Sequence, residues 1–306
     1  MYNYSRRKFI QTTAGLTGLA FALDSFDVKK SKSLLSFSTL GCPDWTYPAI
    51  VNFAAANGYN GIEIRGLQRE LDLTKSAAFS NNDNILASRK LAEEKGIKII
   101  TLGCSTQLHH AELAERKKNL DEAKHFIDLA YQLNCPYIRV FPNNFPKEQE
   151  RNESIDLIVK GMDELSNYTK GSSVCILMET HGDVVWSSDL ETIMKLVEHS
   201  NTGLVWDIHN MWEVTKELPS AVYQKLKKYI RHVHIKDGKV VDGKLQYTLL
   251  GKGESPIFEG IDALRKGGYK GYYSFEWEKM WFPELEEPEV ALADYPKAMK
   301  RHFDKH

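Results

Sequence analysis

The stretch IRHVHIKD, residues 230–237, has the alternating pattern of a β-strand. The side chains of a strand point to its two faces in turn, so His232, His234 and Lys236 share one face. Val233 and Ile235 share the opposite face. This pattern predicts a strand that packs on helices through one face and presents ionisable groups through the other.

Seven further apolar runs of strand length occur along the chain. They are FSTLG from Phe37, GIEIR from Gly61, IKIITLGC from Ile97, YIRVF from Tyr137, VCILMETH from Val174, GLVWDIHN from Gly203 and YYSFEWE from Tyr272. The segments between them, such as AELAERKKNLDEAKHFIDLAYQL at 111–133, carry apolar residues three and four apart and predict helices. Gly58, Gly96 and Gly171 fall between a helix end and a strand start, where a left-handed residue is favoured.

Eight strands that alternate with helices predict parallel β/α units of the α/β class. Eight is also the number that closes a (β/α)8 TIM barrel, which commonly needs about 250 residues. An open, doubly wound sheet is the alternative, but it normally carries a glycine-rich phosphate loop after its first strand. The sequence Gly41-Cys42-Pro43-Asp44 is not such a loop. We therefore predict a single-domain TIM barrel over residues 34–306.

The N-terminal residues have a different character. A basic stretch, SRRKFI at 5–10, precedes an uncharged stretch at 11–23, and Ala20-Phe21-Ala22 supplies small residues at a cleavage site. The pair Arg6-Arg7 resembles a twin-arginine signal. We expect an export signal at 1–22, a short linker at 23–33 and a periplasmic or exported protein. A membrane anchor would need roughly 20 apolar residues, so no stable membrane insertion is expected here or later in the chain.

The composition is that of an ordinary globular protein. The chain has 306 residues, 42% hydrophobic and 26% charged, with a net charge of −1. This balance provides no global basic surface for nucleic acid, so we expect no nucleic-acid partner. Four dispersed cysteines, none in a C-x-x-C pair, are expected to be small buried hydrophobes without a structural disulfide. They are Cys42, Cys104, Cys135 and Cys175.

Four acidic or imidazole side chains fall at similar heights on the last four predicted strands. Glu179 and Asp207 lie 28 positions apart and Asp207 and His234 lie 27 apart, each about one β/α unit. Glu276 follows 42 positions later, and the surplus fits a long loop at 236–254. All four lie toward the carboxyl ends of their strands, where barrel enzymes build their active sites.

Three carboxylates and an imidazole around one point repel each other and are costly to bury without a cation. One divalent metal ion would remove this conflict, and an oxygen-rich set suits Mn²⁺, Mg²⁺ or Co²⁺, with Zn²⁺ an alternative. The competing explanation is a set of structural ion pairs, for which Arg65, Arg139 and Lys236 are available partners. His232, deeper on its strand, is expected to support the site or belong to the core.

The segments METHGD, WDIHN, HVHIKDG and GKGESPIFEGIDALRKGGYKGYYSFEWE resemble the sugar phosphate isomerase/epimerase superfamily, with its xylose-isomerase-like barrel. The resemblance runs from about Phe37 to the C-terminus. In the ketose 3-epimerases of this superfamily, the last four strands hold the metal. The resemblance thus implies Glu179, Asp207, His234 and Glu276 as ligands, with Glu179 and Glu276 as the catalytic proton-transfer pair.

Other polar residues are expected to bind the substrate. These are Lys236, Arg65, His181, His209, Asn210 and Arg139. Lys236 is expected beyond the ligands, pointing at the substrate. Those relatives often carry a histidine three places after the aspartate, where this chain has Asn210, with His209 one place earlier. Tryptophans are expected mainly to pack, while those beyond strand ends are suited to line the face of a sugar.

The resemblance implies an enzyme that moves a proton next to a sugar carbonyl through an enediolate. Because sugar phosphates are scarce outside the cytoplasm, export favours a free, oxidised or glycosidic sugar as the small-molecule partner. The same site would also suit a keto-sugar lyase or hydrolase. An apurinic-endonuclease-like hydrolase would need more histidines and a basic face, and a non-catalytic sugar-binding protein would not need two converging glutamates. A homodimer is compatible with the sequence.

Overall fold

The structure, a computed structural model, describes residues 33–197 and 199–305. The expected export signal at 1–22 lies outside the described residues, as does the expected linker apart from Ser33. The chain from Leu34 onward forms one compact unit.

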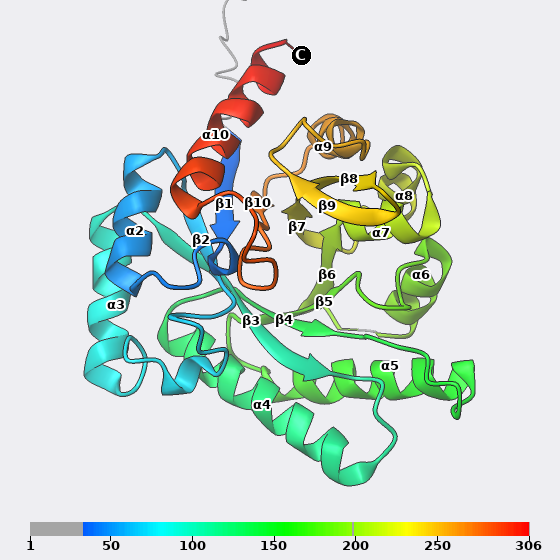
Figure 1. Cartoon of the computed structure of the whole chain (residues 1–306). Helices are drawn as coiled ribbons and strands as arrows, with labels where there is room; N and C mark the ends of the chain where they lie inside the picture. Colours follow the sequence, from blue (N-terminus) through cyan, green and yellow to red (C-terminus); the bar gives the residue numbers. More distant parts are fainter. Residues whose placement is uncertain (1–32, 198, 306) are drawn as a thin grey trace, which may run out of the picture. The chain divides into compact units, whose positions relative to one another are not determined.

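Eight parallel strands close into a barrel in the order β1-β10-β7-β6-β5-β4-β3-β2 (Figure 1). They are β1 (Leu34–Ser38), β2 (Gly61–Ile64), β3 (Lys98–Gln107), β4 (Tyr137–Phe141), β5 (Cys175–Glu179), β6 (Thr202–Asp207), β7 (Ile230–Ile235) and β10 (Tyr272–Phe275). The barrel closes where Leu34 pairs with Tyr272 and Phe37 with Phe275. The prediction of an eight-stranded TIM barrel is confirmed.

Helices lie around the outside of the barrel (Figure 1). They are α2 (Tyr47–Ala56), α3 (Asn82–Glu94), α4 (Leu113–Gln132), α5 (Arg151–Tyr168), α6 (Ser187–Leu196), α7 (Ile208–Thr215), α8 (Pro219–Leu226), α9 (Ile257–Lys266) and α10 (Pro288–Lys305). Short 3-10 turns occur at Thr39–Gly41 and Leu73–Lys75. None of the described helices combines the length and apolar character needed to cross a bilayer.

The apolar faces of the strands form the core between barrel and helices. Ile62 and Ile64 of β2, and Val233 and Ile235 of β7, are fully buried in this core. The opposite faces carry polar groups into the barrel interior. The buried polar residues on these faces include Ser36, Glu63, Thr101, Arg139, His232 and Ser274. Barrel interiors are usually filled with branched hydrocarbon, so a polar interior requires internal partners for these groups.

Two local details follow from the backbone. Gly58 and Gly96 have φ values of 80° and 68°, which confirms the expected left-handed positions between helix and strand.

The α7 helix begins immediately after β6, because the Asp207 side chain accepts a hydrogen bond from the Asn210 N–H at 2.8 Å and so caps the helix.

The long loop expected after β7 contains a β-hairpin. Strands β8 (Asp237–Val241) and β9 (Lys244–Thr248) pair in antiparallel fashion around Asp242 and Gly243. Both turn residues have positive φ, 51° and 75°, as a type I′ turn requires. An Asp-Gly pair between VV and KLQY is a hairpin signal that the loop prediction missed.

The four cysteines all carry free thiols, and three of them are buried. Cys42 and Cys104 pack in the hydrophobic core.

Candidate functional site

A cavity of about 310 Å³ opens at the carboxyl ends of the strands. Its walls combine charged, polar and aromatic side chains. They are Leu40, Arg65, Arg139, Phe141, Glu179, His181, Asn210, Lys236, Tyr247, Glu276, Glu278 and Trp281. This is the end of a TIM barrel at which active sites are built.

The structure brings the four predicted metal ligands together, and two of them, Glu179 and Glu276, line this cavity. Glu179 ends β5, Asp207 ends β6, His234 lies on β7 and Glu276 follows β10. Each offers one ligand atom, and these atoms all lie within 4.8 Å of one another. All four side chains are buried. The spacing in sequence predicted that the four residues lie at the same height on their strands, and in the structure their side chains meet.

The imidazole of His234 is oriented toward the three carboxylates. Its Nε2 lies 3.1 Å from both carboxylate oxygens of Glu63, so Nε2 carries the proton that Glu63 accepts. Its Nδ1 lies 3.3 Å from Glu276 Oε1 and 3.6 Å from Glu179 Oε1. This buried nitrogen has no hydrogen-bond partner among the described residues. A nitrogen that faces carboxylate oxygens in this way fits a shared cation.

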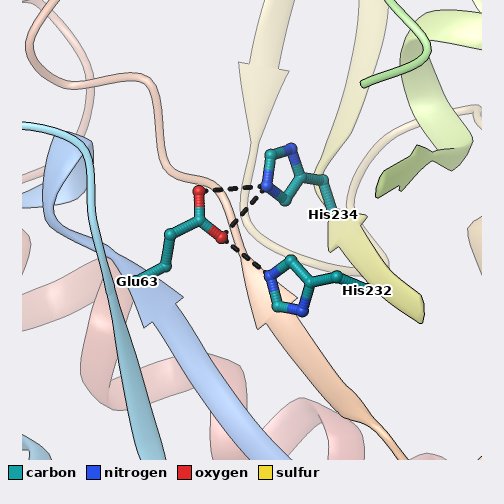
Figure 2. A group of neighbouring side chains, drawn as sticks. All are labelled: Glu63, His232 and His234. Carbon is teal, nitrogen blue, oxygen red and sulfur yellow. Dashed lines mark hydrogen bonds and ion pairs between the residues drawn. The ribbon is translucent and has the colours of Figure 1, made fainter. Parts of the chain in front are cut away.

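Beneath the cavity, Glu63 joins two histidines (Figure 2). His232 Nε2 lies 2.8 Å from Glu63 Oε2, and the Ser274 hydroxyl lies 3.3 Å from the same oxygen. Burial alone would raise the pKa of Glu63, but the charge and hydrogen bonds of His234 and His232 hold it well below its usual range. Glu63 is thus an ionised carboxylate that fixes the proton and the ring orientation of His234, an arrangement common behind metal-binding histidines.

The carboxylates of the cavity outnumber the cations that pair with them. Lys236 Nζ lies 2.9 Å from Asp207 Oδ2, 2.7 Å from Glu276 Oε2 and 2.7 Å from Glu278 Oε1. Arg139 Nε lies 3.0 Å from Glu179 Oε2. The imidazole of His234, whose pKa the surrounding carboxylates raise well above its usual range, faces Glu179, Asp207 and Glu276. Four carboxylates therefore share one lysine, one arginine and one histidine.

Burial and the remaining negative charge raise the pKa of two carboxyls, those of Asp207 and Glu278. Burial, together with the charge of Glu276, raises the pKa of Asp207 to about 6 against the opposing effect of Lys236. The same causes raise the pKa of Glu278 to about 7. Since two carboxyls are pushed toward their neutral forms, a divalent cation fits this set of oxygen and nitrogen donors.

Most residues predicted to bind substrate line the cavity. They are Arg65, Arg139, His181, Asn210 and Lys236. Arg65 donates to the Ser105 hydroxyl at 3.0 Å, while its Nη1 has no partner among the described residues and is free for a ligand. The sequence predicts that Lys236 lies beyond the ligands, yet its ammonium contacts Asp207 and Glu276 directly as well as lining the cavity.

His209 lies outside the lining of the cavity. Its Nδ1 pairs with the Ser255 hydroxyl at 2.7 Å, and its ring is buried. Strand alternation continued past Asp207 would place His209 on the same face as Asp207. Because α7 starts at Ile208, the helical turn brings Asn210, three residues after Asp207, to the cavity in place of His209.

The wall also contains residues that the sequence did not single out for this site: Leu40, Phe141, Tyr247 and Glu278. Glu278 follows Glu276 by two positions, so strand alternation in EWE could have placed it on the same side. Tyr247 comes from the hairpin strand β9, and Phe141 ends β4 with its ring 3.9 Å from the Arg139 guanidinium. Gly103 of β3 provides the space for these arginines, since a Cβ there would lie 2.8 Å from atoms of both Arg65 and Arg139.

The profile of the family described as xylose isomerase-like TIM barrel matches residues 51–302. The chain belongs to this family. No curated protein matches the chain.

Several solved structures share the fold with this chain at low identity. The IOLI protein with a bound zinc atom has a TM-score of 0.75 at 19% identity, over 89% of this chain and 98% of that one. D-psicose 3-epimerase from Clostridium cellulolyticum H10, crystallised with D-tagatose, has a TM-score of 0.71 at 16% identity, over 89% and 98%. The 3-keto-D-glucoside 4-epimerase YcjR from E. coli has a TM-score of 0.69 at 13% identity, over 89% and 100%.

Proposed function

We propose that this chain is a divalent-metal-dependent sugar isomerase or epimerase that moves a proton on a carbon next to a carbonyl. The observation that carries the proposal is the convergence of Glu179 and Glu276, which line a polar cavity, with Asp207 and His234. Two of the similar structures are, by name, sugar epimerases. The substrate class is a free, oxidised or glycosidic sugar.

Glu179, Asp207, His234 and Glu276 would hold one divalent ion. Three oxygens and one nitrogen suit Mn²⁺, Mg²⁺ or Co²⁺, and Zn²⁺ is also compatible with this donor set. The name of the IOLI structure records a zinc atom in that protein. When bound, the ion would act as a Lewis acid that polarises the oxygens of the substrate and stabilises an enediolate.

The two glutamates are the proposed proton carriers. Burial raises the pKa of each, but His234 and the nearby cation lower it: Arg139 beside Glu179, Lys236 beside Glu276. Both carboxylates are therefore kept ionised and able to accept a proton. The unpartnered Nη1 of Arg65 is placed to donate to a substrate oxygen, and Lys236 to stabilise negative charge that develops there.

Deuterium exchange tests this proposal. When the metal-loaded protein acts on a panel of ketoses and keto-glycosides in D₂O, we expect deuterium on the carbon next to the carbonyl, in the product or the recovered substrate. The exchange should stop when EDTA removes the metal. Turnover without any deuterium in either compound would contradict proton transfer with solvent-exchangeable carboxyls.

Elimination is a second candidate reaction on the same site. Glu278 lines the cavity, and its pKa of about 7 leaves it partly protonated at neutral pH. A partly protonated carboxyl beside the site of proton abstraction is suited to protonate a leaving group, which is the step that separates a lyase from an epimerase. An unsaturated product in the D₂O reaction would assign the protein to this class.

Export is proposed from the sequence of residues 1–22. We expect the N-terminus of protein recovered from cells to begin at Leu23, after cleavage behind Ala20-Phe21-Ala22. Sequencing the N-terminus of the exported and cytoplasmic fractions measures this. Intact Met1 in protein that stays in the cytoplasm would contradict export.

A further inference from the structure

A second cavity, of about 480 Å³, lies next to the candidate active site. Tyr247 of the β8–β9 hairpin lines both cavities. The segment that follows β10 supplies the rest of the boundary, since Trp281 lines the first cavity and the adjacent Phe282 lines the second. The two spaces thus meet at a wall of aromatic rings.

Two rings of this wall contact each other, and two remain partly open to solvent. Tyr247 and Phe282 pack edge to face with centroids 5.3 Å apart. Trp281 remains 47% exposed and Phe282 37% exposed. Neighbouring exposed aromatic side chains at the mouth of a cavity are suited to bind a ligand, because their rings bury a large apolar area on contact.

The second cavity differs chemically from the first. The first cavity is crowded with ionisable groups and, at about 310 Å³, is at the small end of ligand sites. The second is lined by the half-exposed Phe282 and the buried Trp277 together with Lys239, Gln246 and Glu284. A pyranose ring has a matching division, with apolar C–H faces and hydroxyl groups around its edge.

We propose that the second cavity is a subsite for a second six-membered ring, so that the substrate is a glycoside whose reacting sugar occupies the first cavity. This inference rests on the proposed function for the position of the reacting sugar. The link between the two rings would pass beside Tyr247. Stacking on Phe282 would hold the second ring, and the surrounding polar side chains would accept and donate hydrogen bonds at its edge.

Binding measurements on the full chain, loaded with Mn²⁺, test the subsite without requiring turnover. The probes are matched sets of the methyl glycoside, the phenyl glycoside and the β-linked disaccharide of glucose, galactose and xylose. In at least one set, we expect the phenyl glycoside or the disaccharide to bind about tenfold more tightly than the methyl glycoside, from the apolar area that the second ring buries. A phenyl preference would indicate an aryl group and a disaccharide preference a second sugar.

Phe282→Ala should remove most of this difference and leave the affinity for the methyl glycoside unchanged, while Phe282→Tyr should retain it. Trp186→Ala is the matched control, because Trp186 is a similarly exposed aromatic residue, 45%, that lines neither cavity. Equal affinities within every set, no binding of any probe, or equal losses in the Phe282→Ala and Trp186→Ala variants would overturn the subsite. Two-ring probes that bind through Phe282 without deuterium exchange would leave the subsite standing and remove the proposed reaction.

Discussion

Replacing Glu276 with glutamine is expected to lower turnover by about 10²- to 10⁴-fold, and Glu179→Gln should do the same. Glutamine keeps the size of the side chain and one oxygen, but its amide cannot accept a proton from carbon. Both carboxylates face His234 Nδ1, at 3.3 Å and 3.6 Å, and both line the cavity, so both would border a substrate bound at the proposed metal site. Measurement of kcat on a substrate identified by deuterium exchange tests this expectation.

The two variants should differ in stability, which separates chemistry from folding. Glu276→Gln leaves Lys236 paired with Asp207 and Glu278. Glu179→Gln removes the carboxylate that pairs with the buried guanidinium of Arg139, and an unpaired buried charge is destabilising. The temperature of thermal unfolding should therefore fall further in Glu179→Gln than in Glu276→Gln.

Glu93→Gln, which changes an exposed side chain of α3, is the control. It should leave both kcat and the unfolding temperature unchanged. Near-parental kcat in both site variants would contradict the proton-transfer assignment. A loss of kcat in step with a loss of folded protein would contradict it as well.

The barrel and the ligand set could be predicted because both depend on local alternation. Val233 and Ile235 fall on one face of β7 and His232 and His234 on the other, whatever the strand pairs with. The regular interval between Glu179, Asp207 and His234 reflects one β/α unit, so equal height follows from repetition of the unit. No long-range information is needed for either conclusion.

Other features depend on contacts that alternation does not specify. Alternation in GIEIR puts Glu63 on the face opposite Ile62 and Ile64, but its bonds to His232 and His234 reach from β2 to β7. Strand alternation gives the face on which a side chain lies, whereas its partner depends on the register and shear of the closed barrel. Asn210 lines the cavity and His209 does not, because α7 begins at Ile208. The ends of helices are the part of a helix that local sequence patterns locate least reliably.

Removal of the His234 imidazole is expected to abolish most metal binding. His234→Ala deletes the one nitrogen donor, and the carboxylates that remain repel each other around the gap. His232→Ala should weaken binding less, because His232 acts through Glu63, with which it shares a hydrogen bond at 2.8 Å. Removing such an outer partner of a ligating histidine typically costs about 10- to 100-fold in metal affinity.

Two further variants, Glu63→Gln and Lys236→Met, test the roles of the residues that contact the proposed ligands. Glu63→Gln keeps the shape beneath His234 but removes the charge that accepts its Nε2 proton, so its affinity should fall into the same range of about 10- to 100-fold. Lys236→Met should bind the ion at least as tightly as the parent. Its ammonium lies 2.9 Å from Asp207 and 2.7 Å from Glu276, so in the parent it competes with the ion for the same carboxylates.

Metal content after dialysis and the Kd for Mn²⁺ and Co²⁺ measure these effects, and the visible spectrum of bound Co²⁺ reports the donor set independently of turnover. We expect one ion per chain in the parent. Two ions per chain would instead indicate that Glu63, His232 and His234 form a separate site, as their clustering also permits. Equal metal content in the parent, His232→Ala and His234→Ala would refute His234 as a ligand. A loss of binding in Lys236→Met as large as in His234→Ala would show that the ammonium organises the carboxylates and does not compete with the ion.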